Sequence, residues 1–355
     1  MVEPGELTKG TILIWGAGAI GGTIGAALAR AGEDVLLVDI EAAHVDAMNR
    51  DGLSIEGPVE AYRQPVRATT PESVTGTYRR IILAVKAHHT PEAIRALKPH
   101  LHDDGSVLSA QNGLNEIVIA DEIGPSRTVG CFVNFGADWL APGRILYGNR
   151  ATVAVGELDG TITDRLRDYH RLLSVLEPDA VTTDNIWGYL WGKLGYGAML
   201  FATALTDASM SENLASPRHF PVYLALGREV MATARARGVL PLGFNGFDPQ
   251  AFMPGADEAA AQASVAAMAE FNRHTAKTHS GIWRDLAVRR RKTEVDAQIA
   301  IIATLAAEAG IPTPAISALV GLIHDIEEGR RDQSWTTLDQ LLDTCISTSR
   351  TAARS

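Results

Sequence analysis

The sequence predicts an α/β protein in two parts, in which an N-terminal domain with a mainly parallel sheet is followed by an all-α C-terminal domain. Two observations lead to this fold class. Through the first half, short apolar runs alternate with helical patterns, which is typical of a parallel sheet covered by helices on both faces. From about residue 185 onward, helical patterns follow one another with almost no strand pattern between them.

The elements of the first half follow in order along the chain. The first strand, 11–15, is followed by a helix of small apolar residues over 20–31, which Gly32 stops. Thr90 is expected to cap a helix that begins at Pro91 and ends at residue 97. The pattern of residue types changes at residue 143. After it, two short segments are expected to form a closing antiparallel pair, 144–147 with 152–155. The other predicted strands are 35–38, 81–85, 106–109 and 128–133, with a strand or hairpin region at 53–68 and further helices at 41–50 and 163–176.

The second half is predicted to be helical throughout. Gly238 and Gly310 follow two of the helical patterns as stop signals. We therefore place a dinucleotide-binding domain at 1–184, a helical substrate and dimerisation domain at 185–345, and a frayed Ser/Thr/Arg-rich tail at 346–355. The expected helices are 187–205, 217–237, 257–274, 286–309 and 313–328.

Composition excludes several classes of function. With 46% apolar and 21% charged residues, the 355-residue chain is suited to folding around sizeable cores. Acidic residues outnumber basic ones 42 to 32, and a net charge of −10 argues against general binding to nucleic acid or to an anionic membrane surface. The only cysteines, Cys131 and Cys345, cannot build a disulfide framework, which favours a reducing compartment.

The sequence predicts neither a targeting segment nor a membrane-spanning segment. Residues 1–10 lack the apolar core of a signal peptide, and no apolar run approaches the ~18 residues of a membrane span. We expect a cytoplasmic protein with no nucleic-acid or membrane partner. The Trp- and Leu-rich helices of the second half are compatible with a homodimer, although a helical domain needs such residues anyway.

The segment Gly16-Ala17-Gly18-Ala19-Ile20-Gly21 is a G-x-G-x-x-G motif placed directly between the first strand and the first helix. In this context it is typical of a Rossmann-type dinucleotide-binding domain. Gly16 permits a tight turn, Gly18 lets the backbone approach a pyrophosphate, and Gly21 lets the helix pack on the strand. The helix N-terminus, with Ala19 and Ile20, offers N–H groups to the anion. The alternative is a glycine-rich turn between core elements.

Asp39 ends the second strand, eighteen residues after Gly21. An acid at this place binds the adenosine ribose hydroxyls and repels a 2′-phosphate, so NAD is favoured over NADP. NADP stays an alternative, because Arg63 or another distant cation could accept the phosphate. Asp39 could also serve only to cap the helix that follows.

Several landmarks in the right order resemble the ketopantoate reductase family, from Ile12 to about Glu328. After the glycine motif these are Val85-Lys86-Ala87, Gln111-Asn112-Gly113, Trp191-Gly192-Lys193-Leu194 and Thr293-Glu294-Val295-Asp296. The resemblance implies a Rossmann domain followed by a helical domain, with a site in the cleft between them. It also implies hydride transfer between a nicotinamide cofactor and a 2-oxo acid.

The resemblance further implies a role for each landmark. Lys193 is similar to a general acid that protonates the carbonyl oxygen, and Glu294 to a carboxylate that interacts with this lysine and the ligand. Asn112 is similar to a residue that holds the nicotinamide ribose or the substrate, and Lys86 to one beside the cofactor. Each has a plainer interpretation: a solvated helical lysine, a first-turn acid, or an Asn-Gly turn.

The substrate positions depart from the family pattern. Relatives that act on ketopantoate usually carry asparagines one and two turns after the lysine, where this chain has Gly197 and Phe201. Neither side chain can hydrogen-bond a substrate hydroxyl, so we expect a bulkier or more apolar oxo or hydroxy acid. Ser280 and Arg284 are further candidates for binding its carboxylate. The alternatives are that Phe201 is a core residue and that Arg284 forms a surface ion pair.

The same residues leave three alternative functions. A β-hydroxyacid-type dehydrogenase would need a glycine-rich substrate loop, and an opine-type enzyme a histidine–acid pair, neither of which is evident. A non-catalytic NAD(P)-sensing protein would keep the glycine motif and lose the proton donor. His88-His89 has no partner at metal-ligand spacing, so no metal is expected.

Overall fold

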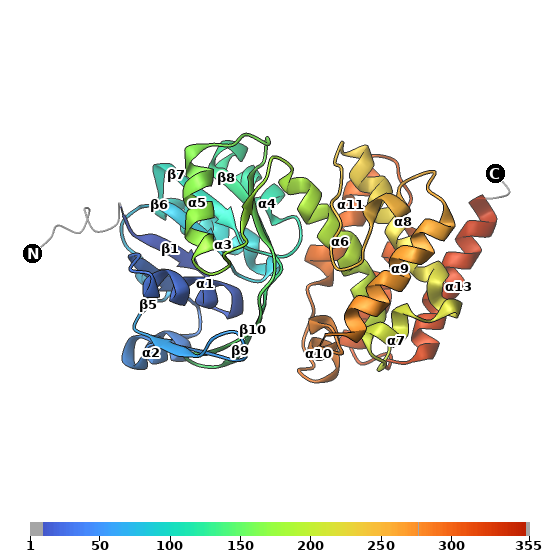
Figure 1. Ribbon diagram of the computed structural model, residues 1–355, viewed down its shortest axis with the longest axis horizontal. Helices are drawn as coiled ribbons and strands as arrows, with labels where there is room; N and C mark the ends of the chain where they lie inside the picture. Colours follow the sequence, from blue (N-terminus) through green and yellow to red (C-terminus); the bar gives the residue numbers. More distant parts are fainter. Residues whose placement is uncertain (1–9, 276, 353–355) are drawn as a thin grey trace, which may run out of the picture. The chain divides into compact units, whose positions relative to one another are not determined.

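The computed structural model describes residues 10–275 and 277–352, and the chain divides into two compact units between Ile186 and Trp187 (Figure 1). This division falls close to the boundary expected after residue 184. The first unit combines sheets and helices, and the second is built from helices. The predicted fold class, a Rossmann-type domain followed by an all-α domain, is therefore confirmed.

The described part of the first unit contains an eight-stranded sheet in the order β12-β11-β8-β7-β6-β1-β2-β5. Neighbouring strands run parallel except β8 and β11, which pair antiparallel. Ile12 and Ile14 point into one core and Leu13 and Trp15 into the other, which explains why the strand is apolar throughout. The strands are β1 (Ile12–Trp15), β2 (Val35–Val38), β5 (Arg67–Thr69), β6 (Tyr78–Leu83), β7 (Leu101–Ser109), β8 (Thr128–Val133), β11 (Val153–Glu157) and β12 (Val181–Thr182).

A second sheet of the first unit corrects one expectation. Its order is β4-β3-β10-β9, with β3 (Leu53–Glu56), β4 (Tyr62–Gln64), β9 (Gly136–Ala141) and β10 (Arg144–Asn149). The antiparallel pair expected between 144–147 and 152–155 is wrong, because β10 pairs with β9 and β3 while β11 pairs with β8. The reversal occurs before β10 instead, at Gly143 with φ +70°.

The first helix is made of small residues because it packs closely on both sheets. A Cβ added at Gly25 would lie 2.4 Å from Leu37 Cδ2 in β2, and one added at Gly22 would lie 2.3 Å from Ile145 Cδ1 in β10. Larger side chains would separate the layers. The helices of this unit are α1 (Ala19–Arg30), α2 (Ala42–Asp51), α3 (Thr90–Leu97), α4 (Asn115–Ile123) and α5 (Asp164–Ser174).

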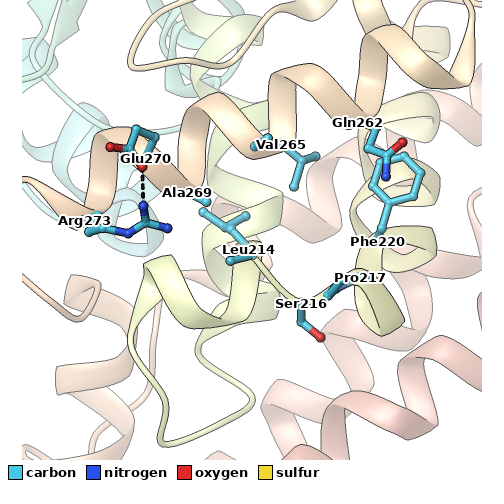
Figure 2. A pocket seen from close by; sticks show the side chains of 11 residues that line it. Leu214, Ser216, Pro217, Phe220, Gln262, Val265, Ala269, Glu270 and Arg273 are labelled. Carbon is cyan, nitrogen blue, oxygen red and sulfur yellow. Dashed lines mark hydrogen bonds and ion pairs between the residues drawn. The ribbon is translucent and has the colours of Figure 1, made fainter.

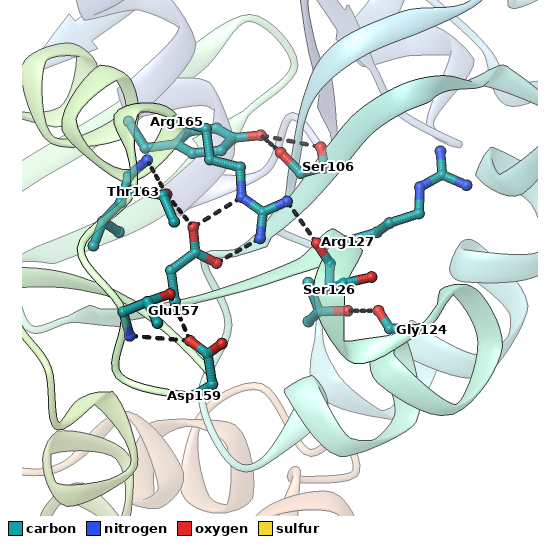
Figure 3. A network of polar contacts seen from close by, with 12 residues as sticks. Ser106, Gly124, Ser126, Arg127, Glu157, Asp159, Thr163 and Arg165 are labelled. Atoms are coloured by element: carbon teal, nitrogen blue, oxygen red, sulfur yellow. Dashed lines mark hydrogen bonds and ion pairs between the residues drawn. The ribbon is translucent and has the colours of Figure 1, made fainter.

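A partly buried ion pair joins β11 to α5 (Figure 3). Arg165 donates from Nε to Glu157 Oε1 at 2.8 Å and from Nη2 to Oε2 at 2.5 Å, and the Glu157 side chain is only 4% exposed. Thr163 also donates to this carboxylate, and Arg165 Nη1 donates to the carbonyl of Ser126 at 2.6 Å. The network ties three chain segments together, and the hydrogen bond to Glu157 raises the pKa of Arg165.

The described part of the second unit contains eight α-helices, whereas the sequence predicted five. The helix expected at 286–309 is interrupted, because Arg289 and Arg291 fold back onto Asp285 and Arg290 adopts φ +47°. The elements are α6 (Ile186–Thr203), α7 (Met210–Leu214), α8 (Phe220–Ala236), α9 (Glu258–Arg273), α10 (Gly281–Ala287), a π-helical turn (Asp296–Ala300), α11 (Ile301–Glu308), α12 (Pro314–Glu327) and α13 (Trp335–Ala352).

The frayed tail expected from residue 346 is also wrong as far as residue 352, because α13 continues through it; residues 353–355 lie outside the described residues. The helix is held by one buried stripe: Leu338, Leu341, Leu342 and Cys345. Their spacing of three and four residues places them on a single helix face. Burial also raises the pKa of the Cys345 thiol to about 12.

Glu229 connects two helices of this unit. Its carboxylate on α8 accepts the N–H groups of Ala315 at 2.9 Å and Ile316 at 2.8 Å, which open α12. Burial raises the pKa of Glu229 to about 7, while the two amides act in the opposite direction. Within residues 10–275 and 277–352, no helix has both the length and the hydropathy needed to cross a bilayer.

Candidate functional site

The glycine motif forms the turn between β1 and α1. Gly16 has φ +101°, and a Cβ there would lie 2.7 Å from Val85 N and 2.8 Å from Ala84 C. A side chain at this position is therefore excluded twice, by the backbone conformation and by the loop after β6. The tight turn expected of the first glycine is present.

The other two motif glycines meet opposite surroundings. A Cβ at Gly18 would meet no atom of the described residues within 4 Å, whereas one at Gly21 would lie 2.0 Å from the Gly16 carbonyl oxygen. Gly18 is the N-cap of α1 and has no side chain with which to occupy the first N–H groups of the helix. The uncharged Ala19 and Ile20 begin the first turn. The loop is thus open at the helix N-terminus, which fits the pyrophosphate of a dinucleotide.

Asp39 lies beside this loop at the end of β2. Its Oδ2 accepts the Ala17 N–H at 3.0 Å, and its Oδ1 accepts the Glu41 N–H at 3.0 Å. The carboxylate therefore orders both the glycine loop and the residue before α2, but it does not cap α2, whose N-cap is Glu41. Each oxygen has a second lone pair, so these bonds are compatible with ribose hydroxyls as additional donors.

His44 is a residue of this region that the sequence analysis missed. It is 1% exposed, its Nδ1 accepts the Gly143 N–H at 2.8 Å, and its Nε2 lies 2.9 Å from the Ala17 carbonyl oxygen. Since Nδ1 accepts, Nε2 carries the proton and donates it to Ala17. This side chain joins the glycine loop to the β9–β10 turn, 99 residues away in sequence. An isolated histidine in a helical pattern carries no signal that would have revealed this role.

The predicted cofactor positions meet at one edge of the large sheet. Asp39 follows β2, Gly16 follows β1, Lys86 follows β6 after two residues, and Asn112 lies in the loop after β7. These four strands are neighbours and parallel, so their carboxyl ends lie together. The carboxyl edge of such a sheet is where doubly wound folds bind nucleotides. His88 and His89 follow Lys86, with ring centres 4.1 Å apart, and the described residues contain no cluster suited to a metal ion.

In the second unit, α6 has one closely packed and one open side. A Cβ at Gly192 would lie 1.9 Å from the Leu242 carbonyl oxygen, and one at Gly195 would lie 2.6 Å from Phe247 Cζ. In contrast, a Cβ at Gly197 would have no described atom within 4 Å. Lys193 is partly buried and precedes Gly197 by one helical turn. The two residues therefore share a face of the helix, next to unfilled space.

Phe201 follows one turn later but is 1% exposed, like an ordinary core side chain. Tyr196 is also buried, and its hydroxyl accepts the side-chain amide of Asn272 at 3.0 Å. Burial raises the pKa of this tyrosine. The core alternative given for Phe201 therefore agrees with its burial.

Glu294 lies in a segment held from a distance. Glu327 on α12 accepts both the Thr293 N–H at 2.7 Å and the Thr293 hydroxyl at 2.6 Å, and the Val295 N–H donates to that hydroxyl at 3.2 Å. The π-helical turn begins at Asp296. Such turns are rare in proteins, and those that occur are often found at functional sites. The placement of Glu294 thus depends on a carboxylate that lies 34 residues after Thr293 in the chain.

Ser280 and Arg284 both belong to the short helix α10 or its cap. The Ser280 hydroxyl accepts the Trp283 N–H at 3.1 Å and the residue is 2% exposed, so it acts as the N-cap of α10. Arg284 lies inside the same helix, next to Asp285, whose carboxylate holds the basic segment after the helix. A helix-capping role for Ser280 was not among the expectations.

An apolar groove in the second unit lies between α9 and the segment from α7 to α8 (Figure 2). Leu214, Phe220 and Val265 line it, and a Glu270–Arg273 ion pair stands at one end. None of the side chains proposed for the site is among its lining residues.

Comparison with known proteins identifies one family along most of the sequence. The family model "Ketopantoate reductase PanE/ApbA" matches residues 12–160, and its C-terminal counterpart matches 185–327. A 2-dehydropantoate 2-reductase of Mesorhizobium japonicum is 28% identical over 338 residues, which cover 88% of this chain and 96% of the relative.

Solved structures show the same fold. A PanE/ApbA family ketopantoate reductase from Ralstonia eutropha JMP134 has a TM-score of 0.75 at 25% identity, covering 90% of this chain and 99% of that one. A ternary structure of D-mandelate dehydrogenase with NADH and anilino(oxo)acetate has a TM-score of 0.77 at 21% identity, covering 90% and 98%. The two family models, which span most of the sequence, show that the chain belongs to the ketopantoate reductase family and is an oxidoreductase of the type that uses a nicotinamide cofactor.

Proposed function

We propose that this protein reduces a 2-oxo acid with an apolar side chain to the 2-hydroxy acid, with NADH as the favoured coenzyme, and that ketopantoate is a poor substrate. The observation that carries the proposal is the position of Gly197, one turn after Lys193, where an added Cβ would meet no described atom within 4 Å. A glycine there offers room for a substrate side chain and no group to hydrogen-bond a hydroxyl. The neighbouring fold of D-mandelate dehydrogenase, solved with anilino(oxo)acetate, is compatible with such a substrate.

The proposed chemistry assigns a separate task to each residue. When bound, the reduced nicotinamide supplies the hydride that adds to the carbonyl carbon. The Lys193 ammonium stabilises the negative charge that develops on the carbonyl oxygen and donates its proton there. Glu294 orients that ammonium, and Ser280 and Arg284 are proposed to bind the substrate carboxylate. Gly16, Gly18 and Gly21 with Ala19 and Ile20 hold the pyrophosphate, while Lys86 and Asn112 lie along the nicotinamide half.

The proposed reaction is tested with a panel of 2-oxo acids of increasing side-chain size, each with NADH and NADPH, read at the nicotinamide absorbance. We expect phenylglyoxylate or branched oxo acids without a side-chain hydroxyl to exceed ketopantoate in kcat/KM. Gly197→Asn should reverse this order, since it fills the space and restores an amide. Gly321→Asn is the matched control, because Gly321 is also inside a helix with no described atom near its Cβ position. A high kcat/KM for ketopantoate in the unmodified protein would contradict the proposal, and NADH binding without any turnover would favour the sensing protein instead.

Asp39→Ala is expected to weaken NADH binding by about tenfold and NADPH binding much less, because a carboxylate that accepts ribose hydroxyls is lost. Loss of the negative charge also removes repulsion of a 2′-phosphate. Dissociation constants for both coenzymes, from NADH and NADPH fluorescence, give the ratio. Asp46→Ala is the control, because it removes the same charge from an exposed position on α2. An equal loss for both coenzymes would show that Asp39 acts only on the backbone.

A further inference from the structure

The loops after β6 and β7 are joined by a buried chain of neutral side chains. The backbone bond from Ala110 N–H to the Leu83 carbonyl, at 2.8 Å, closes the ladder between these strands. Beyond it, the link passes to Thr90, Gln111 and Asn115, which are 0%, 5% and 5% exposed. These three residues come from the start of α3, the loop after β7 and the start of α4.

The hydrogen bonds of this network are donated outward from Gln111 toward both ends. The Gln111 amide donates one proton to the Val85 carbonyl at 2.9 Å and the other to the Thr90 hydroxyl at 2.8 Å. That hydroxyl donates to Asn115 Oδ1 at 2.8 Å. The Asn115 amide donates to the carbonyl of Asn112 at 2.7 Å. The Gln111 amide uses both of its N–H groups and the Thr90 hydroxyl both accepts and donates, so inverting either side chain would leave a buried polar group unpaired.

The two ends of this hydrogen-bonded network are the carbonyls of Val85 and Asn112, which lie at the positions proposed to meet the nicotinamide half. Val85 directly precedes Lys86, and Asn112 directly precedes Gly113, whose φ of +101° forms the turn. Together with the backbone bond between Ala110 and Leu83, this side-chain link sets the separation of the two backbone segments. Since its members are neutral, the link does not change with pH in the physiological range.

We propose that Thr90, Gln111 and Asn115 are positioning residues that hold the Val85–Lys86 and Asn112–Gly113 segments in register for the nicotinamide half of the coenzyme, with Thr90 as the central member. The proposal rests on the proposed function only in that a nicotinamide coenzyme binds at this sheet edge. Thr90 both accepts from Gln111 and donates to Asn115, so replacing its hydroxyl interrupts the chain at its midpoint.

Thr90→Val tests the proposal, because valine keeps the volume and removes the hydroxyl. We expect the Kd for NADH to rise about tenfold, which corresponds to the loss of one buried hydrogen bond. In the protein without coenzyme, amide hydrogen exchange should quicken in both segments, 85–89 and 110–115. Thr90→Ser, which restores the hydroxyl, should return both measurements toward those of the unmodified protein.

Thr128→Val is the matched control. Thr128 is also 0% exposed and donates one hydrogen bond, to the Gly124 carbonyl at 3.0 Å, but it lies at the start of β8. It should lower stability without changing the Kd for NADH or the exchange of the two segments. If Thr90→Val fails to fold, Asn115→Ala interrupts the same chain at α4 and carries the same expectations.

Unchanged NADH binding in Thr90→Val, an equal rise in the Thr128→Val control, or faster exchange in only one of the two segments would each overturn the positioning role. Neither measurement requires a substrate. A wrong assignment of the oxo acid would therefore appear in the turnover panel and leave these results unaffected.

Discussion

Lys193→Ala is expected to lower kcat by a factor of about 10² to 10⁴, the contribution of a well-placed general acid, with little change in the Kd for NADH. The expectation follows from the position of Lys193, which shares an open face of α6 with Gly197. Without the ammonium, charge that develops on the carbonyl oxygen has no proton donor. Steady-state kinetics with the best oxo acid of the panel, together with NADH fluorescence, separate the two effects.

Two further variants make this prediction specific. Lys193→Arg keeps the positive charge but does not release its proton at neutral pH. Its kcat should therefore stay lower than it would be if Lys193 acted through its charge alone. Lys292→Ala removes a lysine from an exposed segment of the same unit and should leave kcat unchanged. Normal turnover of Lys193→Ala would rule out the acid role.

Arg165→Ala is expected to reduce the free energy of unfolding by about 3–5 kcal/mol, the usual cost of leaving one member of a buried ion pair without its partner. Glu157 is 4% exposed, and in this variant its carboxylate would keep only the hydroxyl of Thr163 from the network of Figure 3. The change would also release the Ser126 carbonyl. Urea unfolding of the full chain, followed by circular dichroism, measures the difference.

A matched exposed pair on the same helix provides the control. Arg167 binds Asp164 at 2.6 Å, with side chains 60% and 100% exposed, so Arg167→Ala should cost less than about 1 kcal/mol. Changing both Glu157 and Arg165 to methionine should recover much of the stability lost in Arg165→Ala, because no charge then stays buried. A cost for Arg165→Ala similar to that for Arg167→Ala would show that the network contributes little.

The parts of the fold that depend on local pattern were predicted well. The strands of the large sheet are apolar on both faces, so they appear as continuous runs, and the conformation at Gly16 follows from neighbours in sequence. The C-terminal part of α13 shows the limit of composition: the serines and threonines after Cys345 suggested a frayed tail, whereas the helix, anchored by the buried stripe that ends in Cys345, continues to Ala352.

Errors arose where the partner is distant in the chain. The strand β10 pairs with β3, about ninety residues earlier, and no turn signal near Gly148 encodes that register. The helix expected at 286–309 breaks because Asp285 binds the arginines after it and Glu327 holds Thr293. Such bonds form only when the chain is compact, so local propensity cannot predict them.

By itself, the sequence determined the two-part architecture, the glycine turn and the family to which the chain belongs, because each depends on short patterns of residue type. Only the tertiary structure decided that Ala17 is held by Asp39 on one side and His44 on the other, and that Thr90 belongs to a chain linking two loops. The physical reason is that a buried polar group must find a partner wherever the fold brings one, at any separation in sequence.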